Sequence, residues 1–347
     1  MTTEADVLLR VEDLSMRFET TKGLFSRRGR MVVDAVKNVD LTVRRGETLG
    51  LVGESGCGKT TLGRCVQRAY RPTGGRLRYR RADGTEVDLA TLGRGALGPY
   101  RREIRTIFQD PNSSLNPRMT VGQIVGEPLR ANRLARGADL RDRVADALRL
   151  VGLQPEYMRR YPHAFSGGQR QRIGIARALI TNPRLVIADE AVSALDVSVR
   201  SQILNLLEDL QEQLDLTYVF VSHDLSVIQH LCDRVAVMYV GRIVEEAATD
   251  DLYARPRHPY TETLLRALPL PDPRLRGTRR RVPLKGEVPD PADPPTGCTF
   301  HPRCPYAQDD CARTEPRLLA IEAGHEARCH YAKTLDLAGV AEPASTS

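Results

Sequence analysis

Residues 50–66 carry a glycine-rich pattern whose chemistry is phosphate binding. The stretch GLVGESGCGKTTLGRCV contains G-x-x-x-x-G-K-T, with Gly53, Gly58, Lys59 and Thr60 at the fixed positions. Glycines let the backbone curl so that successive N–H groups point at an anion, and a helix N-terminus adds partial positive charge. The lysine would reach the β- and γ-phosphates, and the threonine would hold Mg²⁺. An apolar run before the pattern and helical spacing after it are the context that this motif requires, so we predict a nucleotide site.

A second element of a phosphate site lies at residues 183–196, PRLVIADEAVSALD. Four apolar residues predict a buried parallel strand, and Asp189 and Glu190 follow at the C-terminal end, where doubly wound sheets bind ligands. We expect Asp189 to hold Mg²⁺, directly or through water, and Glu190 to polarise the attacking water. The alternative is a strand that ends in solvated acids, which the phosphate loop upstream disfavours.

A third element, FSGGQRQRIGIARAL at residues 165–179, is a turn that leads into a helix and offers a second set of N–H groups to an anion. Two such cradles in one chain suggest a site completed by another subunit. With these motifs in this order, the sequence resembles the ATP-binding-cassette (ABC) family, whose signature motif matches Ser166, Gly167, Gly168 and Gln169. The resemblance implies an α/β fold of the P-loop type, with a RecA-like core, an antiparallel β subdomain and an α-helical subdomain. It also implies ATP, Mg²⁺ and ATP hydrolysis.

The resemblance assigns further residues to the ATP site. Glu190 is the implied general base, Gln109 contacts the metal and the attacking water, and His223 contacts the γ-phosphate. Ser166 and Gly168 are implied to bind ATP held by an opposite subunit, and Phe18 is a candidate for adenine stacking. The full nucleotide set implied is Phe18, Gly53, Glu54, Ser55, Gly56, Cys57, Gly58, Lys59, Thr60, Thr61, Gln109, Ser166, Gly167, Gly168, Gln169, Asp189 and Asp196, with Thr60, Gln109 and Asp189 at the Mg²⁺.

Two positions depart from the usual pattern of the family. The signature begins with Phe165 where leucine is commoner, and Ala191 stands where the family usually has proline. Neither change removes a catalytic group, so we expect the chain to hydrolyse ATP.

The chain's organisation follows from its hydrophobic spacing and its proline density. We predict an ABC domain at residues 1–255 with a helical subdomain at about 110–180, a C-terminal module at 256–335 and a disordered tail at 336–347. The expected elements include a hairpin at 74–89, helices at 139–153 and 197–214, a strand at 216–223 and a strand pair across Gly241.

The C-terminal module narrows the resemblance to one class of transporter. RHPYTETLLRALP (257–269) and LKGEVPDPADPPTGCTFHPRCPYA (284–307) resemble the ATPase subunits of bacterial oligopeptide/dipeptide importers, most closely the second, F-type subunit. This implies a peripheral place on the cytoplasmic face of the membrane, two transmembrane permease subunits, a second ABC ATPase in a heterodimer and, indirectly, an extracytoplasmic peptide-binding protein. Peptides are the expected cargo, although nickel and other small cargoes use similar subunits.

Four cysteines in the module have the spacing C-x5-C-x6-C-x17-C: Cys298, Cys304, Cys311 and Cys329. Structural zinc sites commonly contain short C-x2-4-C knuckles, which are absent, whereas four thiolates without a knuckle fit an iron–sulfur cluster. The resemblance also implies a [4Fe-4S] cluster. Zinc, with His301, His325 or His330 as substitute ligands, and unmetallated packing thiols remain alternatives. Disulfides are disfavoured because cytosolic thiols stay reduced.

Composition sets outer bounds on the function. The 347 residues are 41% hydrophobic and 27% charged, and no apolar run is long enough for a membrane span. Basic clusters at 26–30, 76–81, 101–105 and 276–281 leave open a soluble cassette ATPase that acts on nucleic acid or ribosomes. We expect no nucleic-acid partner, because the chain has no Trp and only 5% aromatic residues for base stacking. The N-terminus lacks the pattern of a signal peptide.

Overall fold

The computed structural model describes residues 6–20, 31–268 and 286–340. The chain folds into two compact units, each built from segments that are distant in sequence. The first unit comprises Met1–Leu8, Val43–Thr48 and Thr91–Val221; the second comprises Leu9–Thr42, Leu49–Ala90 and Ser222–Ser347. Basic clusters 26–30 and 276–281 and the tail from residue 341 lie outside the described residues.

A parallel run of three strands organises the first unit. Strand β7 (Leu185–Asp189) lies between β6 (Ile104–Ile107) and β8 (Thr217–Ser222), and both neighbours pair with it in parallel. Residues 185–188 are buried, as the apolar run predicted. Because the three strands run in the same direction, the loops that follow them leave from one edge of the sheet.

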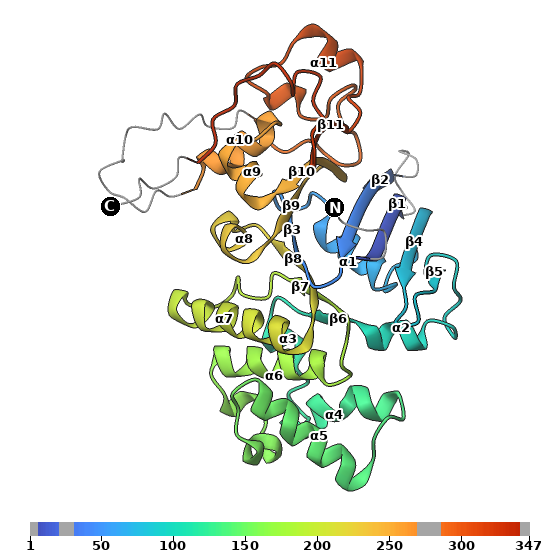
Figure 1. The fold of residues 1–347 in the computed structure, drawn as a ribbon, viewed down its shortest axis with the longest axis vertical. Helices are drawn as coiled ribbons and strands as arrows, with labels where there is room; N and C mark the ends of the chain where they lie inside the picture. Colours follow the sequence, from blue (N-terminus) through green and yellow to red (C-terminus); the bar gives the residue numbers. More distant parts are fainter. Residues whose placement is uncertain (1–5, 21–30, 269–285, 341–347) are drawn as a thin grey trace, which may run out of the picture. The chain divides into compact units, whose positions relative to one another are not determined.

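Helices make up the rest of the first unit. They are α2 (Gly98–Glu103), α3 (Pro111–Ser114), α4 (Val121–Ala131), α5 (Gly137–Leu150), α6 (Gly167–Leu179) and α7 (Val197–Leu214), with 3-10 turns at Pro155–Arg159 and Pro162–Ala164. Figure 1 shows α4, α5 and α6, in green, packed side by side. The helices predicted at 139–153 and 197–214 are confirmed as α5 and α7. Gly126 lets α4 approach α5 closely, because a Cβ there would lie 3.2 Å from the side chains of Leu140 and Val144.

The second unit contains a four-stranded sheet in the order β2 (Met31–Arg44), β1 (Val7–Thr20), β4 (Gly74–Arg80) and β5 (Glu86–Asp88). Strand β4 is antiparallel to both of its neighbours. The hairpin predicted at 74–89 is confirmed as β4 and β5.

The second unit also contains five neighbouring strands that pair in both parallel and antiparallel fashion. Their order is β3 (Thr48–Val52), β9 (Arg234–Tyr239), β10 (Arg242–Ala248), β12 (His325–Ala327) and β11 (Leu319–Glu322). β3 and β9 are parallel, and the remaining pairs are antiparallel. The strand pair predicted across Gly241 is confirmed as β9 and β10. The pairing of β12 with β10 brings residues near the C-terminus into the sheet that includes β3.

Short helices complete the second unit. They are α1 (Lys59–Val66), α8 (Leu225–Leu231), α9 (Thr249–Ala254), α10 (Pro259–Arg266) and α11 (Asp309–Arg313), with the 3-10 turn η5 (His301–Arg303). Tyr239, Tyr260 and Phe300, each at most 1% exposed, pack against one another with ring centroids 4.6–5.4 Å apart. In the part of the chain that the structure describes, no helix is both long and apolar enough to cross a lipid bilayer.

Candidate functional site: a phosphate loop and a carboxylate pair

The phosphate loop connects β3 to α1, as its sequence context predicted. Lys59 is the first residue of α1 and is 5% exposed. Its ammonium donates hydrogen bonds to the carbonyl oxygens of Gly53, at 2.7 Å, and Glu54, at 2.9 Å. The side chain of Lys59 thus folds back over the backbone of its own loop, and its positive charge lies near the N-terminus of α1. Thr60 and Thr61 follow in the first turn and are half-buried.

The loop's course requires glycine at two positions. Gly53 has φ +151°, and a Cβ there would lie 2.1 Å from the carbonyl oxygen of Met238. Gly58 has φ +108°, and its Cβ would lie 2.2 Å from the carbonyl oxygen of Ala35. Any residue with a Cβ atom at position 53 or 58 would therefore collide with the neighbouring backbone, so both positions require glycine.

Glu190 stands in a strained backbone conformation directly after β7. Its φ of +49° is rare for a residue with a side chain. Three hydrogen bonds hold the peptide in place: Glu190 N–H donates to the Val221 carbonyl at 2.9 Å, and the Glu190 carbonyl accepts from the N–H and hydroxyl of Ser193. Strain of this kind persists where the surroundings determine it and is common at active sites. Asp189 precedes it at the end of β7 and is half-buried.

Gln109 and Glu190, which are 81 residues apart, meet in the structure. The Gln109 amide donates to a Glu190 carboxylate oxygen at 2.7 Å. Gln109 follows β6 and Glu190 follows β7, so the shared edge of parallel strands brings them together. An amide beside a carboxylate gives a polar pair that can orient a water molecule.

The signature turn begins helix α6 as a capping box. The Ser166 hydroxyl accepts from Gln169 N–H at 3.3 Å, and the Gln169 side chain accepts from Ser166 N–H at 3.1 Å. Ser166 and Gly167 are exposed, whereas a Cβ at Gly168 would lie 2.5 Å from a methyl group of Val199. The helix start is therefore open to solvent at its tip and tightly packed one residue further on.

The departures from the family pattern have simple structural settings. Phe165 is 5% exposed and packs edge-on against Tyr157 at a centroid distance of 5.4 Å. Ala191 is buried, and its carbonyl accepts a hydrogen bond from the buried Gln171 side chain at 2.7 Å. Both positions fill packed interiors and leave the polar groups of the site untouched.

The remaining predicted residues occupy separate places. Asp196 precedes α7 as its N-cap residue and is exposed, and His223 follows β8 and is exposed. Phe18 lies on β1 with its ring edge-on to Tyr70 at 5.5 Å. The phosphate loop, Phe18 and His223 belong to the second unit, whereas Gln109, Asp189, Glu190, Asp196 and the signature turn belong to the first.

The four clustered cysteines near the C-terminus line one cavity. Cys298, Cys304, Cys311 and Cys329 share it with rings that include Phe300 and Tyr306. Burial is the main cause that raises the pKa of Cys298, of Cys304 to about 12 and of Cys329 to about 11, and neighbouring thiols add to it. All seven cysteines are free thiols. As the side chains lie, no group of three or more His, Cys, Asp or Glu residues in the described ranges is arranged to hold a metal ion.

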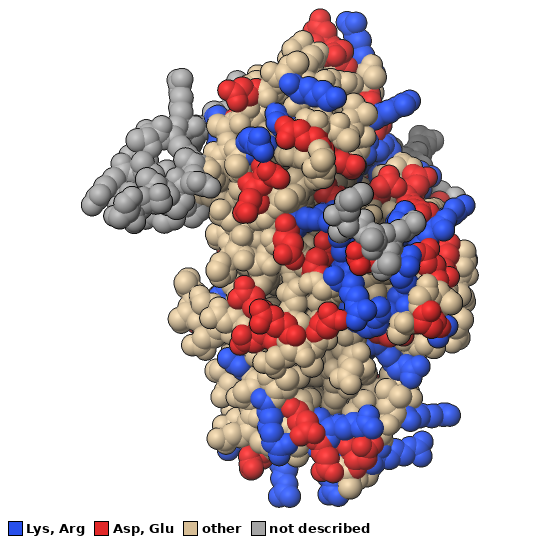
Figure 2. Space-filling model, in the orientation of Figure 1, with Lys and Arg blue, Asp and Glu red and all other residues tan. Residues whose placement is uncertain are grey.

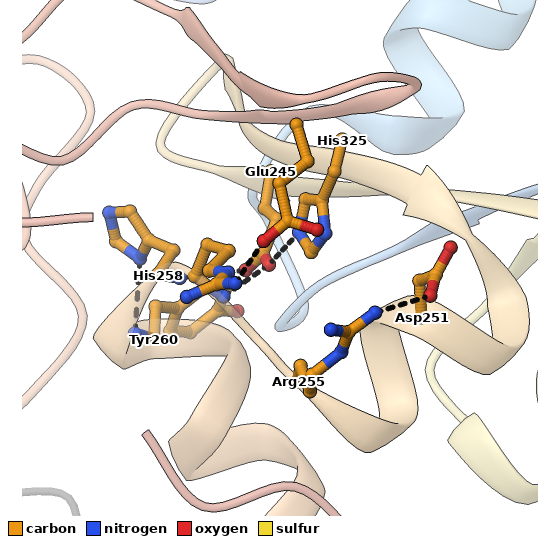
Figure 3. Close-up of polar contacts among 8 residues, drawn as sticks. Glu245, Asp251, Arg255, His258, Tyr260 and His325 are labelled. Carbon is orange, nitrogen blue, oxygen red and sulfur yellow. Dashed lines mark hydrogen bonds and ion pairs between the residues drawn. The ribbon is translucent and has the colours of Figure 1, made fainter. Parts of the chain in front are cut away.

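Glu245, on β10, forms buried contacts with two distant histidines that were not expected from the sequence. It is fully buried, and Figure 3 shows His325 and His258 around it. Its carboxylate accepts from His258 N–H at 2.9 Å and contacts a ring nitrogen of His325 at 2.8 Å. The His258 ring in turn accepts from Tyr260 N–H at 3.0 Å, which caps helix α10. Burial and the charge of Arg328 lower the pKa of His258 to about 3, so this imidazole is neutral.

The basic cluster at 76–81 is neutralised locally. Arg78 pairs with Glu12 at 3.1 Å, and Arg80 pairs with Glu86 at 2.6 Å. Figure 2 shows basic and acidic side chains interspersed on the visible face. In cluster 101–105, Arg105 has its pKa lowered by burial, so it lies partly withdrawn from solvent. The paired Arg78 and Arg80 and the half-buried Arg105 each attract a polyanion less than an exposed, unpaired arginine would.

Comparison with known proteins agrees with this geometry. The family model described as ABC transporter matches residues 36–193, and that described as Oligopeptide/dipeptide transporter, C-terminal region, matches residues 244–311. The probable peptide ABC transporter ATP-binding protein y4tS of Sinorhizobium fredii is 51% identical over 94% of this chain and 90% of its own length. This chain belongs to the ABC transporter family. It is an ATPase of that family, for which ATP and Mg²⁺ are the expected cofactors.

Other relatives and solved structures support the same family. The putative oligopeptide transport ATP-binding protein YkfD of Bacillus subtilis is 48% identical over 93% of this chain and 95% of its own. The dimeric ATP-binding cassette MJ0796, bound to ADP and Pi after hydrolysis, has a TM-score of 0.59 at 28% identity over 70% of this chain and 99% of its own. The cbiO1 structure from Clostridium perfringens, part of the ABC transporter complex cbiONQ, also gives 0.59 at 28% identity, over 72% and 91%. These matches confirm the predicted P-loop ABC fold; the separate cysteine module stays a prediction.

Proposed function

We propose that the chain is the ATP-binding and ATP-hydrolysing subunit of an importer for dipeptides and oligopeptides. The observation that carries the proposal is the combination of an ABC cassette with the oligopeptide/dipeptide transporter C-terminal region in one chain. Relatives named as peptide or oligopeptide transport ATP-binding proteins match both parts at 46–51% identity over at least 93% of the chain. Nickel or another small cargo is the alternative within the same architecture.

The proposed roles follow from where the polar groups lie. Lys59, Thr60 and Thr61 bind the phosphates and Mg²⁺ at the start of α1. Glu190 takes the proton of the attacking water, and Gln109 orients that water through the hydrogen bond observed between the two side chains. Asp189 supports the metal, His223 orders the γ-phosphate, and Phe18 stacks on adenine.

The exposed signature turn supports a second subunit in the working assembly. Ser166 is exposed and Gly168 is half-buried at the N-terminus of α6, where N–H groups attract an anion. We propose that they bind ATP held by the phosphate loop of a second, different ABC ATPase, with Asp196 at the junction. ATP then closes the pair, and hydrolysis reopens it.

The proposed setting is the cytoplasmic face of the membrane, where the chain binds two permease subunits through its helical subdomain, at about 110–180. A peptide-binding protein delivers the cargo from outside. The domain boundaries proposed are 1–255 for the cassette and 256–335 for the C-terminal module. Of the tail predicted at 336–347, residues 341–347 lie outside the described residues. The prediction is wrong for residues 336–340, where Ala338 N–H donates to Glu262 at 2.9 Å and Val340 N–H donates to the Tyr253 carbonyl at 2.7 Å.

Affinity purification of the tagged chain from detergent-solubilised membranes tests this setting. The expected result is co-purification of two polytopic membrane proteins and a second ABC ATPase, and ATP-dependent uptake of labelled tripeptide after reconstitution of the complex into vesicles. Uptake of Ni²⁺ but not peptide would change the cargo. Recovery of ribosomes or nucleic acid in place of permeases would overturn the importer assignment.

We further propose that Cys298, Cys304, Cys311 and Cys329 hold a [4Fe-4S] cluster, with zinc as the alternative. Their shared buried cavity supports four thiolate ligands, although the thiols as placed do not form a closed metal shell. Such a group would tie down a proline-rich segment that has little core of its own. Anaerobic purification should give about four irons and four sulfides per chain, lost together in Cys304→Ser. Stoichiometric zinc without sulfide would favour the alternative, and absence of both metals would reject metal binding.

A further inference from the structure

The phosphate loop is bound from the side by two residues of the C-terminal segment. The guanidinium of Arg303 forms a two-pronged ion pair with the carboxylate of Glu54, at 2.7 and 3.0 Å. The hydroxyl of Tyr260 accepts a hydrogen bond from the backbone N–H of the same glutamate at 2.8 Å. Both the side chain and the peptide of Glu54, the first variable residue of the glycine-rich loop, are therefore fixed from outside the loop.

The surroundings make the Arg303–Glu54 pair stronger than a surface pair. Arg303 is 7% exposed and lies near the ring of Tyr239, whose hydroxyl is 3.3 Å from the guanidinium. Hydrogen bonds to Glu54 raise the pKa of Arg303 above its usual value. Two parallel hydrogen bonds between a planar guanidinium and a carboxylate fix direction as well as distance, and exclusion of water strengthens them.

The position of Arg303 is also linked to the cysteines that line the cavity. Arg303 ends the turn η5 (His301–Arg303), which is followed by Cys304 and whose first residue donates its N–H to the Cys298 carbonyl at 2.9 Å. Phe300, at the start of the turn, is buried against Tyr239 and Tyr260. The position of Arg303 is therefore set by the same turn that brings two of the four thiols to their cavity.

We propose that Arg303 is a positioning residue for ATP binding: the turn between Cys298 and Cys304 holds the phosphate loop in its binding form through Arg303 and Glu54. This inference rests on the proposed nucleotide site at Lys59. Because the Lys59 ammonium donates to the Glu54 carbonyl, a displaced Glu54 moves an acceptor that holds the phosphate-binding lysine. Ordering the loop in advance lowers the entropy that ATP binding must otherwise overcome.

Equilibrium binding of a fluorescent ATP analogue with Mg²⁺ to the purified full chain tests the proposal. Arg303→Ala and Glu54→Gln should each weaken binding roughly tenfold, as for loss of a charged hydrogen bond. The double variant should be no weaker than the worse single variant, because both remove one interaction. Arg303→Lys keeps the charge but loses the fork, so it should recover only part of the affinity.

Arg257→Ala is the matched control, because the side chain of Arg257 pairs with Glu322 in the same unit. It should leave the affinity for the analogue within about twofold, since it removes an ion pair without touching the loop. Melting without nucleotide separates a local effect from unfolding. If Arg303→Ala does not fold, Arg303→Lys and Glu54→Gln decide the matter.

Wild-type affinity in the folded Arg303 and Glu54 variants, or simple additivity in the double variant, would overturn the proposal. Lys59→Ala separates failure of the proposed nucleotide site from failure of the role proposed for Arg303. If Lys59→Ala binds the analogue as tightly as the wild type, the proposed nucleotide site fails. If only Lys59→Ala loses binding, the site stands and the role of Arg303 fails.

Discussion

The phosphate loop and the residues proposed for hydrolysis differ in their burial and in their hydrogen-bond partners. Lys59 is buried across its own loop, and Glu54 is fixed by Arg303 and Tyr260. Gln109 and His223, in contrast, are exposed, and Glu190 is half-buried with an amide as its partner. The side chains that contact the phosphate loop are thus buried or paired, while the groups proposed to act on water are exposed or half-buried. We propose from this difference that ATP binding is separable from the later exclusion of water for hydrolysis.

The largest effect expected from this comparison is on turnover. Glu190→Gln removes the proposed general base but keeps the hydrogen bond to Gln109, so ATP hydrolysis should fall roughly 10²–10⁴-fold. Affinity for ATP should stay near that of the wild type, because the phosphate loop is unchanged. Phosphate release by the assembled complex and equilibrium binding measure the two effects. A variant that hydrolyses ATP at the wild-type rate would contradict the role of Glu190.

The next effect is on binding. Lys59→Ala should weaken ATP binding by on the order of 100-fold, because it removes a charged group aimed at the phosphates. Lys37→Ala, on β2, provides a control for the loss of one positive charge from the same unit. Equal losses of affinity in both variants would mean that overall charge, and not the loop, attracts the nucleotide.

The signature turn offers a sharper pair of variants. Gly168→Ala should destabilise the fold by about 1–3 kcal/mol, because the new methyl group overpacks Val199. Val199→Ala should restore much of that stability. Gly167→Ala is the matched control, since its Cβ would meet the nearest atom, on Leu195, at 3.8 Å. Melting temperatures of Gly168→Ala, Val199→Ala, the double variant of these two and Gly167→Ala test this explanation, and equal destabilisation by both glycine changes would contradict it.

The last effect concerns the pH dependence of stability that arises from the buried His258, whose ring accepts a hydrogen bond from Tyr260 N–H. The folded pKa of His258 is about 3 and its unfolded value is near 6.5, so the unfolded chain binds more protons between these values. The free energy of unfolding therefore falls as pH falls through this window, by about 2 kcal/mol at pH 5. His258→Asn keeps an acceptor for Tyr260 N–H and should lessen the loss, whereas His230→Asn, at an exposed site, should not. Identical pH profiles for all three proteins would exclude His258 as the source.

The sequence predicted the elements whose chemistry is local. The glycines at 53 and 58, the carboxylates after β7 and the Ser166 turn are each defined by a few adjacent residues, and the hairpins follow from strand spacing. The link between Arg303 and Glu54 spans 249 residues, and no local pattern marks it. No local pattern marks Glu245 either, because its buried contacts come from His258 and His325 in distant segments.

The most direct test of this account measures ATP bound and phosphate released on the same preparations of the assembled wild type, Lys59→Ala and Glu190→Gln. The account predicts a crossed pattern: Lys59→Ala loses both quantities because it does not bind, and Glu190→Gln keeps binding but loses release. Parallel losses of binding and hydrolysis in the two variants would show that the buried loop and the exposed residues do not divide the work, and would contradict the account.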